Sequence, residues 1–165
     1  MEYKKYIWYA CYGSNMLKER FMAYITGGNY EGREYKGCDD KTLPSDDRSV
    51  LIPYELYFAK ESSRWNNCGV AFIDAEIRDS TLGRMYLITE NQYEQLRDQE
   101  GRIWYDKEIK LGECEGVPIK TFTHGTRFEE NAPALRYLDI IQRGIRETYP
   151  ELKVVGMGED RKSVV

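Results

Sequence analysis

The chain has 165 residues, and its 24 Lys+Arg and 28 Asp+Glu give a net charge of −4 at neutral pH. This length supports one domain with a substantial core, since about 100–200 residues make up a typical domain. With 41% hydrophobic and 32% charged residues, the composition is typical of a globular protein rather than a disordered or fibrous one. The mild acidity argues against a general nucleic-acid binder, which needs a basic surface.

No segment approaches the run of about 18 apolar residues that predicts a membrane-spanning helix. Two lysines precede an apolar run at residues 6–11, but this run is too short and too aromatic for a signal peptide and lacks a cleavage site of small residues. The four cysteines are scattered without a C-x-x-C pair, which favours reduced thiols. We therefore expect one domain over residues 1–155, a flexible tail over 156–165, and a cytoplasmic protein with no nucleic-acid or membrane partner.

The first part of the chain predicts a strand, a helix and a long loop. Residues 6–11 predict a buried strand that ends in a tight turn. Apolar residues at roughly helical spacing then predict a helix over 16–25, with Ser14 or Asn15 as its N-cap. Residues 26–49 are polar, rich in glycine and without periodicity, so they predict a long loop.

The middle of the chain has the pattern of a β-meander followed by a helix. Three apolar runs, over 50–59, 69–73 and 82–88, predict three successive strands. Thr89 and Gln92 have the spacing of a capping box, so a second helix is expected to begin near residue 90. This helix should end at Glu100 and Gly101, since glycine suits the residue that follows a helix.

Two further strands are expected near 105–111 and 117–123, and a last amphipathic helix between Pro133 and Pro150. Strands joined by turns, with helices at intervals, indicate an α+β domain. Its expected core is a curved, mixed and mainly antiparallel sheet, or a small barrel, with flanking helices.

The strand–turn–helix junction at Tyr12, Gly13, Ser14 and Asn15 is the first candidate site. The N-terminus of a helix offers unpaired backbone N–H groups and a partial positive charge, so it can hold a carboxylate or a phosphate. Gly13 permits a close approach of the ligand to the backbone. Most such junctions are only capped turns, and this segment alone does not decide between the two readings.

Glu100 is the second candidate, as a general base at the negative end of a helix dipole. By composition alone, a solvated acid at the end of a helix is the favoured interpretation, since the chain has 28 acidic residues. The single histidine, His124, would have to serve any Ser-His or Cys-His arrangement. No ligand spacing supports a metal site, so we expect no metal and no cofactor.

Several segments in order resemble the gamma-glutamylcyclotransferase family. The run Tyr9-Ala10-Cys11-Tyr12-Gly13-Ser14-Asn15-Met16 is similar to the Y-G-S-N-[LM] signature of that family. The segments over residues 62–71 and 82–86 resemble its polar turn with a Trp and its V-x-G-x-[VL]-[YW] strand. Residues 96–101, with Tyr105 after them, are similar to its L-D-x-x-E-G…Y segment, and Pro133, Tyr137 and Gly144 match its C-terminal helix.

This resemblance implies the family's α+β fold and its intramolecular reaction. The α-amine of a γ-glutamyl group attacks its own γ-carbonyl, releasing 5-oxoproline and an amine, amino acid or peptide. Glu100 would be the catalytic acid and base, and residues 12–15 would bind the anionic part of the small-molecule substrate. Tyr105 could donate its hydroxyl to the substrate or to Glu100, although a packing role is equally compatible with the sequence.

Two other functions remain open at this point. The same fold could be a non-catalytic module that binds a small carboxylate, since fold does not fix activity. Ser14 or Cys11 could instead be the nucleophile of an amide hydrolase, although no base is adjacent to either in sequence. The sequence leaves open the leaving group of the substrate, the role of the 26–49 segment and the oligomeric state.

Overall fold

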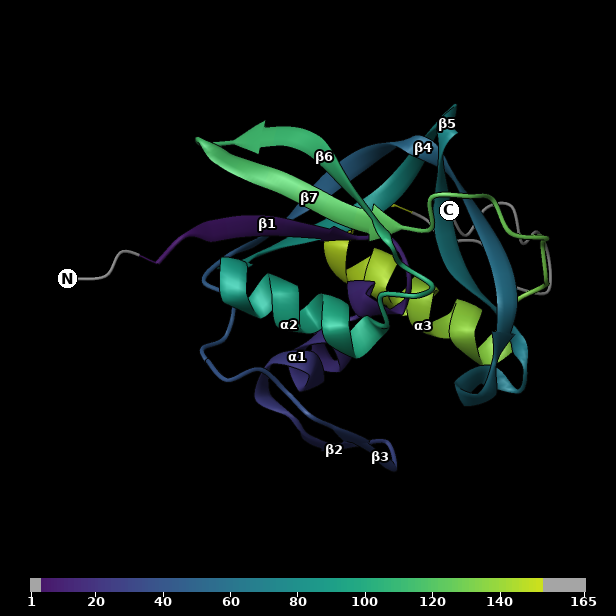
Figure 1. Cartoon of the computed structure of the whole chain (residues 1–165), viewed down its shortest axis with the longest axis horizontal. Helices are drawn as coiled ribbons and strands as arrows, with labels where there is room; N and C mark the ends of the chain where they lie inside the picture. Colours follow the sequence, from purple (N-terminus) through teal and green to yellow (C-terminus); the bar gives the residue numbers. More distant parts are fainter. Residues whose placement is uncertain (1–3, 153–165) are drawn as a thin grey trace.

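The computed structural model describes residues 4–152 and shows an open, five-stranded sheet with helices packed against it (Figure 1). The strand order is β4-β5-β1-β7-β6, and the strands are β1 (Tyr6–Cys11), β4 (Asp47–Ser62), β5 (Cys68–Thr89), β6 (Lys107–Cys114) and β7 (Val117–Thr123). β1 pairs with β7 in parallel, and all other pairs in the sheet are antiparallel. The expected α+β class with a mixed, mainly antiparallel sheet is therefore confirmed, in its open form rather than as a closed barrel.

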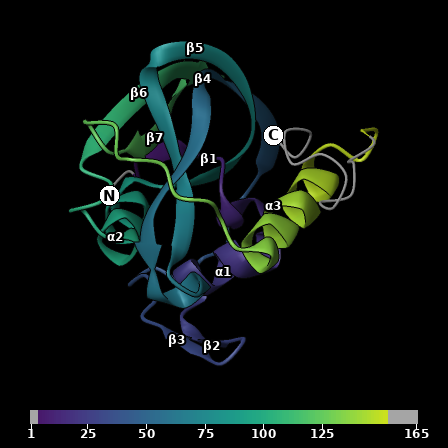
Figure 2. The same cartoon turned by 90° about the vertical axis from the view of Figure 1, so that its right-hand side faces the viewer.

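The helices are α1 (Lys18–Thr26), α2 (Glu90–Glu100) and α3 (Leu135–Thr148), with two short 3₁₀ turns, η1 (Ser14–Met16) and η2 (Ser63–Trp65). All three α-helices lie below the sheet in Figure 1, while Figure 2 shows the long β4–β5 ribbon curving past them. Aromatic rings fill the space between the layers, with Phe21 of α1 stacked 4.1 Å from Tyr86 of β5. The central strand β1 is therefore covered on the side where the helices lie.

The second helix follows its sequence signals closely. The Thr89 side chain accepts from the Gln92 N–H, and the Gln92 side chain accepts from the Thr89 N–H, so both halves of the capping box are present. Gly101 ends the helix with φ of 100°. Both expectations are confirmed because they depend on residues close in sequence, Thr89 and Gln92 at the start of the helix and Gly101 directly after its last residue.

The expected helix over 16–25, capped by Ser14 or Asn15, is wrong in its start. Residues 14–16 form the turn η1, and α1 begins only after Leu17, with no side-chain cap. Tyr86 donates its hydroxyl to the Asn15 carbonyl at 2.9 Å, and Arg84 donates to the Met16 carbonyl at 2.9 Å. These bonds from β5 hold the turn apart from the helix.

The expected meander of three strands is also wrong, because β4 and β5 form one long ribbon. The polar residues between 73 and 82 do not form a turn; they continue β5 through register shifts near Tyr54. Residues 76–80 of β5 are exposed there, whereas residues 53–56 of β4 are half-buried. The expected loop over 26–49 contains a hairpin, β2 (Gly28–Tyr30) and β3 (Arg33–Tyr35), and the start of β4. The expected tail at 156–165 lies outside the described residues, and the single domain over 1–155 stays a prediction.

Gly144 provides a test of how α3 packs on η1. A Cβ added at this position would lie 2.5 Å from the Met16 carbonyl carbon and 2.7 Å from the Leu17 nitrogen. In an exposed helix interior, Gly→Ala stabilises a protein by about 1 kcal/mol. Here we expect Gly144→Ala to destabilise the protein by about 1–3 kcal/mol, because the two backbone atoms near the added Cβ cannot move away without displacing η1. The measurement is the free energy of unfolding in urea.

Gly125→Ala is the matched control, because the nearest atom to its added Cβ is 3.6 Å away. An unfolding free energy of Gly144→Ala equal to that of the unaltered protein would contradict the close contact between α3 and η1.

Candidate active site

Two segments of the predicted site, 85 positions apart in sequence, meet in the structure. The Asn15 amide Nδ2 donates to Glu100 Oε1 at 2.7 Å and to the Tyr9 hydroxyl at 3.2 Å. Asn15 is 5% exposed and belongs to η1, while Glu100 is the last residue of α2. The amide nitrogen of Asn15, which is a donor, therefore faces the Glu100 oxygen, which is an acceptor.

The lengths of β1 and α2 explain why these segments meet. β5 pairs antiparallel with β1, so Thr89 lies opposite Tyr6 and α2 begins beside the start of β1. The 11 residues of α2 extend about 16 Å, and the 6 residues of β1 extend about 20 Å. Figure 1 shows α2 running along β1 in the same direction, which brings Glu100 to the turn that follows the strand.

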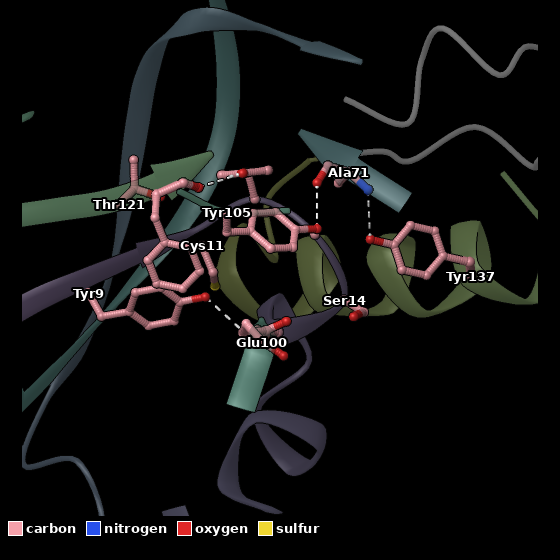
Figure 3. Close-up of a pocket in the computed structure, with 12 residues that line it drawn as sticks. Tyr9, Cys11, Ser14, Ala71, Glu100, Tyr105, Thr121 and Tyr137 are labelled. Carbon is pink, nitrogen blue, oxygen red and sulfur yellow. Dashed lines mark hydrogen bonds between the residues drawn. The ribbon is translucent and has the colours of Figure 1, made fainter. Parts of the chain in front are cut away.

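A small cavity lies at this junction (Figure 3). Glu100 and Ser14 lie on one side of the space, and Tyr105 and Ala71 lie on the other. Every predicted site residue contributes to its wall. The lining residues are Tyr9, Cys11, Tyr12, Gly13, Ser14, Asn15, Ala71, Glu100, Tyr105, Thr121, Phe122 and Tyr137.

The turn that lines this cavity has backbone N–H groups without a hydrogen-bond partner among the described residues. Met16 donates its N–H to Gly13 and Leu17 donates to Ser14, which closes the turn. Within residues 4–152, the N–H groups of Gly13, Ser14 and Asn15 make no hydrogen bond. These donors belong to a 3₁₀ turn and not to the N-terminus of a long helix. An anion would therefore be bound by the adjacent N–H groups themselves, without the contribution of a helix dipole.

Two tyrosines, Tyr105 and Tyr137, form hydrogen bonds with the backbone of β5 on the far side of the cavity. The Ala71 N–H donates to the Tyr137 hydroxyl at 3.0 Å, and the Tyr105 hydroxyl donates to the Ala71 carbonyl at 3.0 Å. Tyr105 therefore gives its proton to the backbone and not to Glu100. The Tyr137 hydroxyl also makes a side-chain hydrogen bond with Ser14, and a Cβ added at Gly13 would lie only 3.0 Å from its oxygen.

Burial keeps the hydroxyls around the cavity protonated. Desolvation raises the pKa of Tyr9, Tyr12 and Tyr105 well above its ordinary value, with a smaller contribution from the negative charge of Glu100. Burial likewise raises the pKa of Tyr137 to about 12. The Tyr12 hydroxyl points away and donates to the Phe122 carbonyl at 2.7 Å, so Tyr12 contributes its backbone and ring to the wall.

The side chains that a hydrolase would use are poorly placed for nucleophilic attack. Cys11 is buried and donates its Sγ–H to the Arg84 carbonyl at 3.3 Å, and desolvation raises the pKa of its thiol far above the usual range. Ser14 Oγ accepts from Arg20 Nε at 3.0 Å. His124 lies outside this cavity and bonds to Thr126, so it cannot serve Ser14 or Cys11 as a base.

Sequence reasoning missed several residues of the wall. Tyr9, Ala71, Thr121 and Phe122 reach the cavity from three different strands, and only the pairing of those strands brings them together. Tyr137 was part of the family resemblance but was not assigned to the site. Its hydroxyl contact with β5 depends on how α3 packs, for which the sequence carries no local signal.

No group of three or more His, Cys, Asp or Glu side chains among residues 4–152 is arranged to hold a metal ion. None of the helices over the same residues is long and apolar enough to cross a membrane.

Comparison with solved structures shows which fold carries this cavity. A gamma-glutamyl cyclotransferase superposes with a TM-score of 0.63 and 22% identity, covering 88% of this chain and 81% of that chain. The chain has the gamma-glutamyl cyclotransferase fold. An uncharacterized human protein gives a TM-score of 0.63 at 23% identity, covering 90% and 83% of the two chains. YkqA from Bacillus subtilis gives 0.60 at 23% identity, covering 90% of this chain and 51% of that chain.

In sequence, the chain is 31% identical over 185 aligned positions to a protein named Histone deacetylase 5 from Arabidopsis thaliana. The match covers 86% of this chain but only 28% of the plant protein, so the chain spans less than a third of the length of that relative. No protein-family model matches the chain.

The buried state of Cys11 predicts its reactivity toward an alkylating reagent. Iodoacetamide reacts with the thiolate and not with the protonated thiol. Because its raised pKa keeps the Cys11 thiol protonated at pH 8, we expect iodoacetamide not to modify Cys11 in the folded protein. The half-buried Cys68 and Cys114 should be modified first, as followed by mass spectrometry of the digested protein. In urea all these cysteines should react at similar rates, and modification of Cys11 as fast as Cys68 in the folded protein would contradict this environment.

Proposed function

We propose that the protein is a γ-glutamyl cyclotransferase-type enzyme that releases 5-oxoproline from a small γ-glutamyl amine, amide or peptide. The single observation that carries this proposal is the Glu100 carboxylate, held by Asn15 at 2.7 Å in the wall of a cavity that the turn of residues 12–15 also lines. A positioned carboxylate beside a row of N–H donors is what the intramolecular reaction requires. The fold is that of a protein named for this activity, which supports the same reading.

In the proposed mechanism the substrate supplies its own nucleophile. The N–H groups of Gly13, Ser14 and Asn15 bind the α-carboxylate, and Glu100 takes a proton from the α-ammonium. The free amine attacks the γ-carbonyl carbon, forming a C–N bond and a tetrahedral intermediate. Glu100 then passes the proton to the departing nitrogen and the old C–N bond breaks. The ring nitrogen gives up its second proton to the released amine, which leaves the five-membered lactam 5-oxoproline.

The protein contributes mainly position and proton transfer in this scheme. Holding the amine beside its own carbonyl supplies the entropic advantage of an intramolecular reaction. The scheme requires no metal or cofactor, since no external nucleophile has to be activated. Asn15 acts as a positioning residue, because its amide fixes the carboxylate that moves the proton.

We place this reaction in the cytoplasm. All four cysteines are unpaired, as expected in a reducing compartment. The proposed partner is a small molecule, and the proposal involves neither nucleic acid nor a membrane.

The direct test is Glu100→Gln, assayed for 5-oxoproline against a panel of γ-glutamyl compounds. The amide keeps the size of the side chain but cannot accept the proton, so we expect turnover to fall by about 10²–10⁴-fold. Glu90→Gln is the matched control, because Glu90 is an exposed acid at the opposite end of the same helix. It should retain full activity.

The alternatives give different results in the same experiment. A non-catalytic carboxylate-binding module would bind the compounds without turnover in the unaltered protein. A Ser- or Cys-dependent hydrolase would remain active in Glu100→Gln and lose activity in Ser14→Ala or Cys11→Ala. Either of these outcomes would refute the proposed function.

A further inference from the structure

Glu100 lies where two hollows meet, at the end of a helix. It lines the candidate active-site cavity and also a second, outer hollow, and Ser14, Tyr105 and Tyr137 line both, so Glu100 stands at the junction between them. It is also the last residue of α2. The last carbonyl groups of a helix have no partner within the helix, so a helix end is held mainly by contacts with the rest of the fold. Whatever fixes the end of α2 therefore fixes the carboxylate.

Three glutamines on one face of α2 bind the segment of residues 36–42. They have the i, i+3, i+7 spacing that places side chains on the same side of a helix, and they are Gln92, Gln95 and Gln99. The first donates to two carbonyls of the segment at 2.8 and 2.9 Å. The second accepts from the Asp39 N–H and donates to the Asp39 carboxylate, both at 2.8 Å.

Gln99 differs from the other two because it also bonds to a second helix. Its Oε1 accepts from the Gly37 N–H at 3.2 Å, and its Nε2 donates to the Tyr24 carbonyl of α1 at 2.9 Å. These partners lie 62 and 75 positions away in sequence. The helices α1 and α2 pack side by side (Figure 1). Gln99 therefore joins the last turn of α2 to α1.

The helix α1 is in turn fixed to η1, the turn that lines the cavity. Only Leu17 separates the two elements, and its carbonyl accepts the N–H groups of Arg20 and Phe21, both at 3.1 Å. The Arg20 side chain also donates from Nε to Ser14 Oγ at 3.0 Å. A displacement of α2 relative to α1 is therefore also a displacement relative to the cavity wall.

The end of α2 is thus attached to this η1–α1 unit through two neighbouring side chains. Glu100 accepts from Asn15 of η1 at 2.7 Å, and Gln99 donates to Tyr24 of α1 at 2.9 Å. Adjacent residues of an α-helix project about 100° apart, so the two bonds act on different sides of the helix. One bond alone would let the helix end pivot, and the second bond removes that freedom.

The backbone that Gln99 accepts from has little room to move. Gly37 has a φ of 78°, and a Cβ added there would lie 2.7 Å from the Gly27 nitrogen and 3.0 Å from the Thr26 carbonyl carbon. The segment is therefore packed closely against the end of α1. Gln99 consequently binds two fixed backbone groups and not a loose loop.

We propose that Gln99 is a positioning residue that holds the end of α2, so that the Glu100 carboxylate stays bound to Asn15 and within reach of both hollows. Gln99 lines neither hollow, so it acts through Glu100 and not on a substrate. The inference rests on the proposed function for its effect on turnover, whereas the positioning itself is a property of the folded protein without substrate.

The test is Gln99→Met, which keeps the length of the side chain and removes both hydrogen bonds. We expect kcat for 5-oxoproline release to fall by about 10- to 100-fold, because a misplacement of about 1 Å can cost that much. KM should change by less than about 3-fold, since the N–H groups proposed to bind the substrate are unaltered.

Gln95→Met is the matched control. It makes the same substitution on the same face of the same helix, and it also removes two hydrogen bonds to the 36–42 segment. Its bonds go to Asp39 and not to α1, so it should retain the kcat of the unaltered protein. A general loosening of the segment would lower kcat in both variants.

A second readout needs no substrate. The side-chain amide hydrogens of Asn15, which are bound to Glu100 and Tyr9, can be followed by NMR. We expect their exchange with solvent to be at least about 10-fold faster in Gln99→Met and unchanged in Gln95→Met.

An unchanged kcat in Gln99→Met, or equal losses in Gln95→Met and Gln99→Met, would overturn the positioning role. If the unaltered protein releases no 5-oxoproline, the proposed function fails and the exchange measurement decides alone. Faster exchange confined to Gln99→Met would then support the role, and unchanged exchange would refute it. Thermal unfolding reports whether Gln99→Met folds. If it does not, Gln99→Glu, which can accept from Gly37 but cannot donate to Tyr24, replaces it with Gln95→Glu as control and the same expected outcomes.

Discussion

The hydrogen bond between Asn15 and Glu100 is the contact on which the candidate site depends. It joins the turn after the central strand to the end of the helix that runs beside that strand. The turn itself is held by bonds from β5 to the Asn15 and Met16 carbonyls, and by α3 packed against it. The carboxylate therefore has a fixed position relative to the free N–H groups, as proton transfer to a bound substrate requires.

The position of Glu100 between two hollows is consistent with its proposed role as the residue that transfers the proton. One proton must leave the attacking nitrogen and reach the departing nitrogen, and these atoms lie on opposite sides of the reacting carbon. A single carboxylate can serve both only from the junction, where the glutamyl part and the leaving group meet. The cavity side presents backbone and hydroxyl groups, whereas Arg20 and Arg64 line the outer side.

Features set by local bonds could be predicted from the sequence, and features set by distant contacts could not. The capping box at Thr89 and the end of α2 at Gly101 follow from neighbouring residues, and the β1 strand from one apolar run. The start of α1 could not be predicted, because β5 side chains hold η1. Arg20 resembles a surface residue of an amphipathic helix in sequence. Its burial depends on Ser14 and on Trp65, which comes from another part of the chain. The family resemblance indicated Glu100, the turn and Tyr105, but not that Tyr105 and Tyr137 bond to the backbone of β5 at Ala71.

The most direct measurement is a crystal structure of the Glu100→Gln protein with γ-glutamyl-alanine bound. The account predicts the α-carboxylate on the N–H groups of residues 12–15, the α-amine within hydrogen-bond distance of the side chain at position 100, and the γ-carbonyl carbon at the junction of the two hollows. A ligand bound elsewhere, or one whose amine points away from position 100, would contradict it.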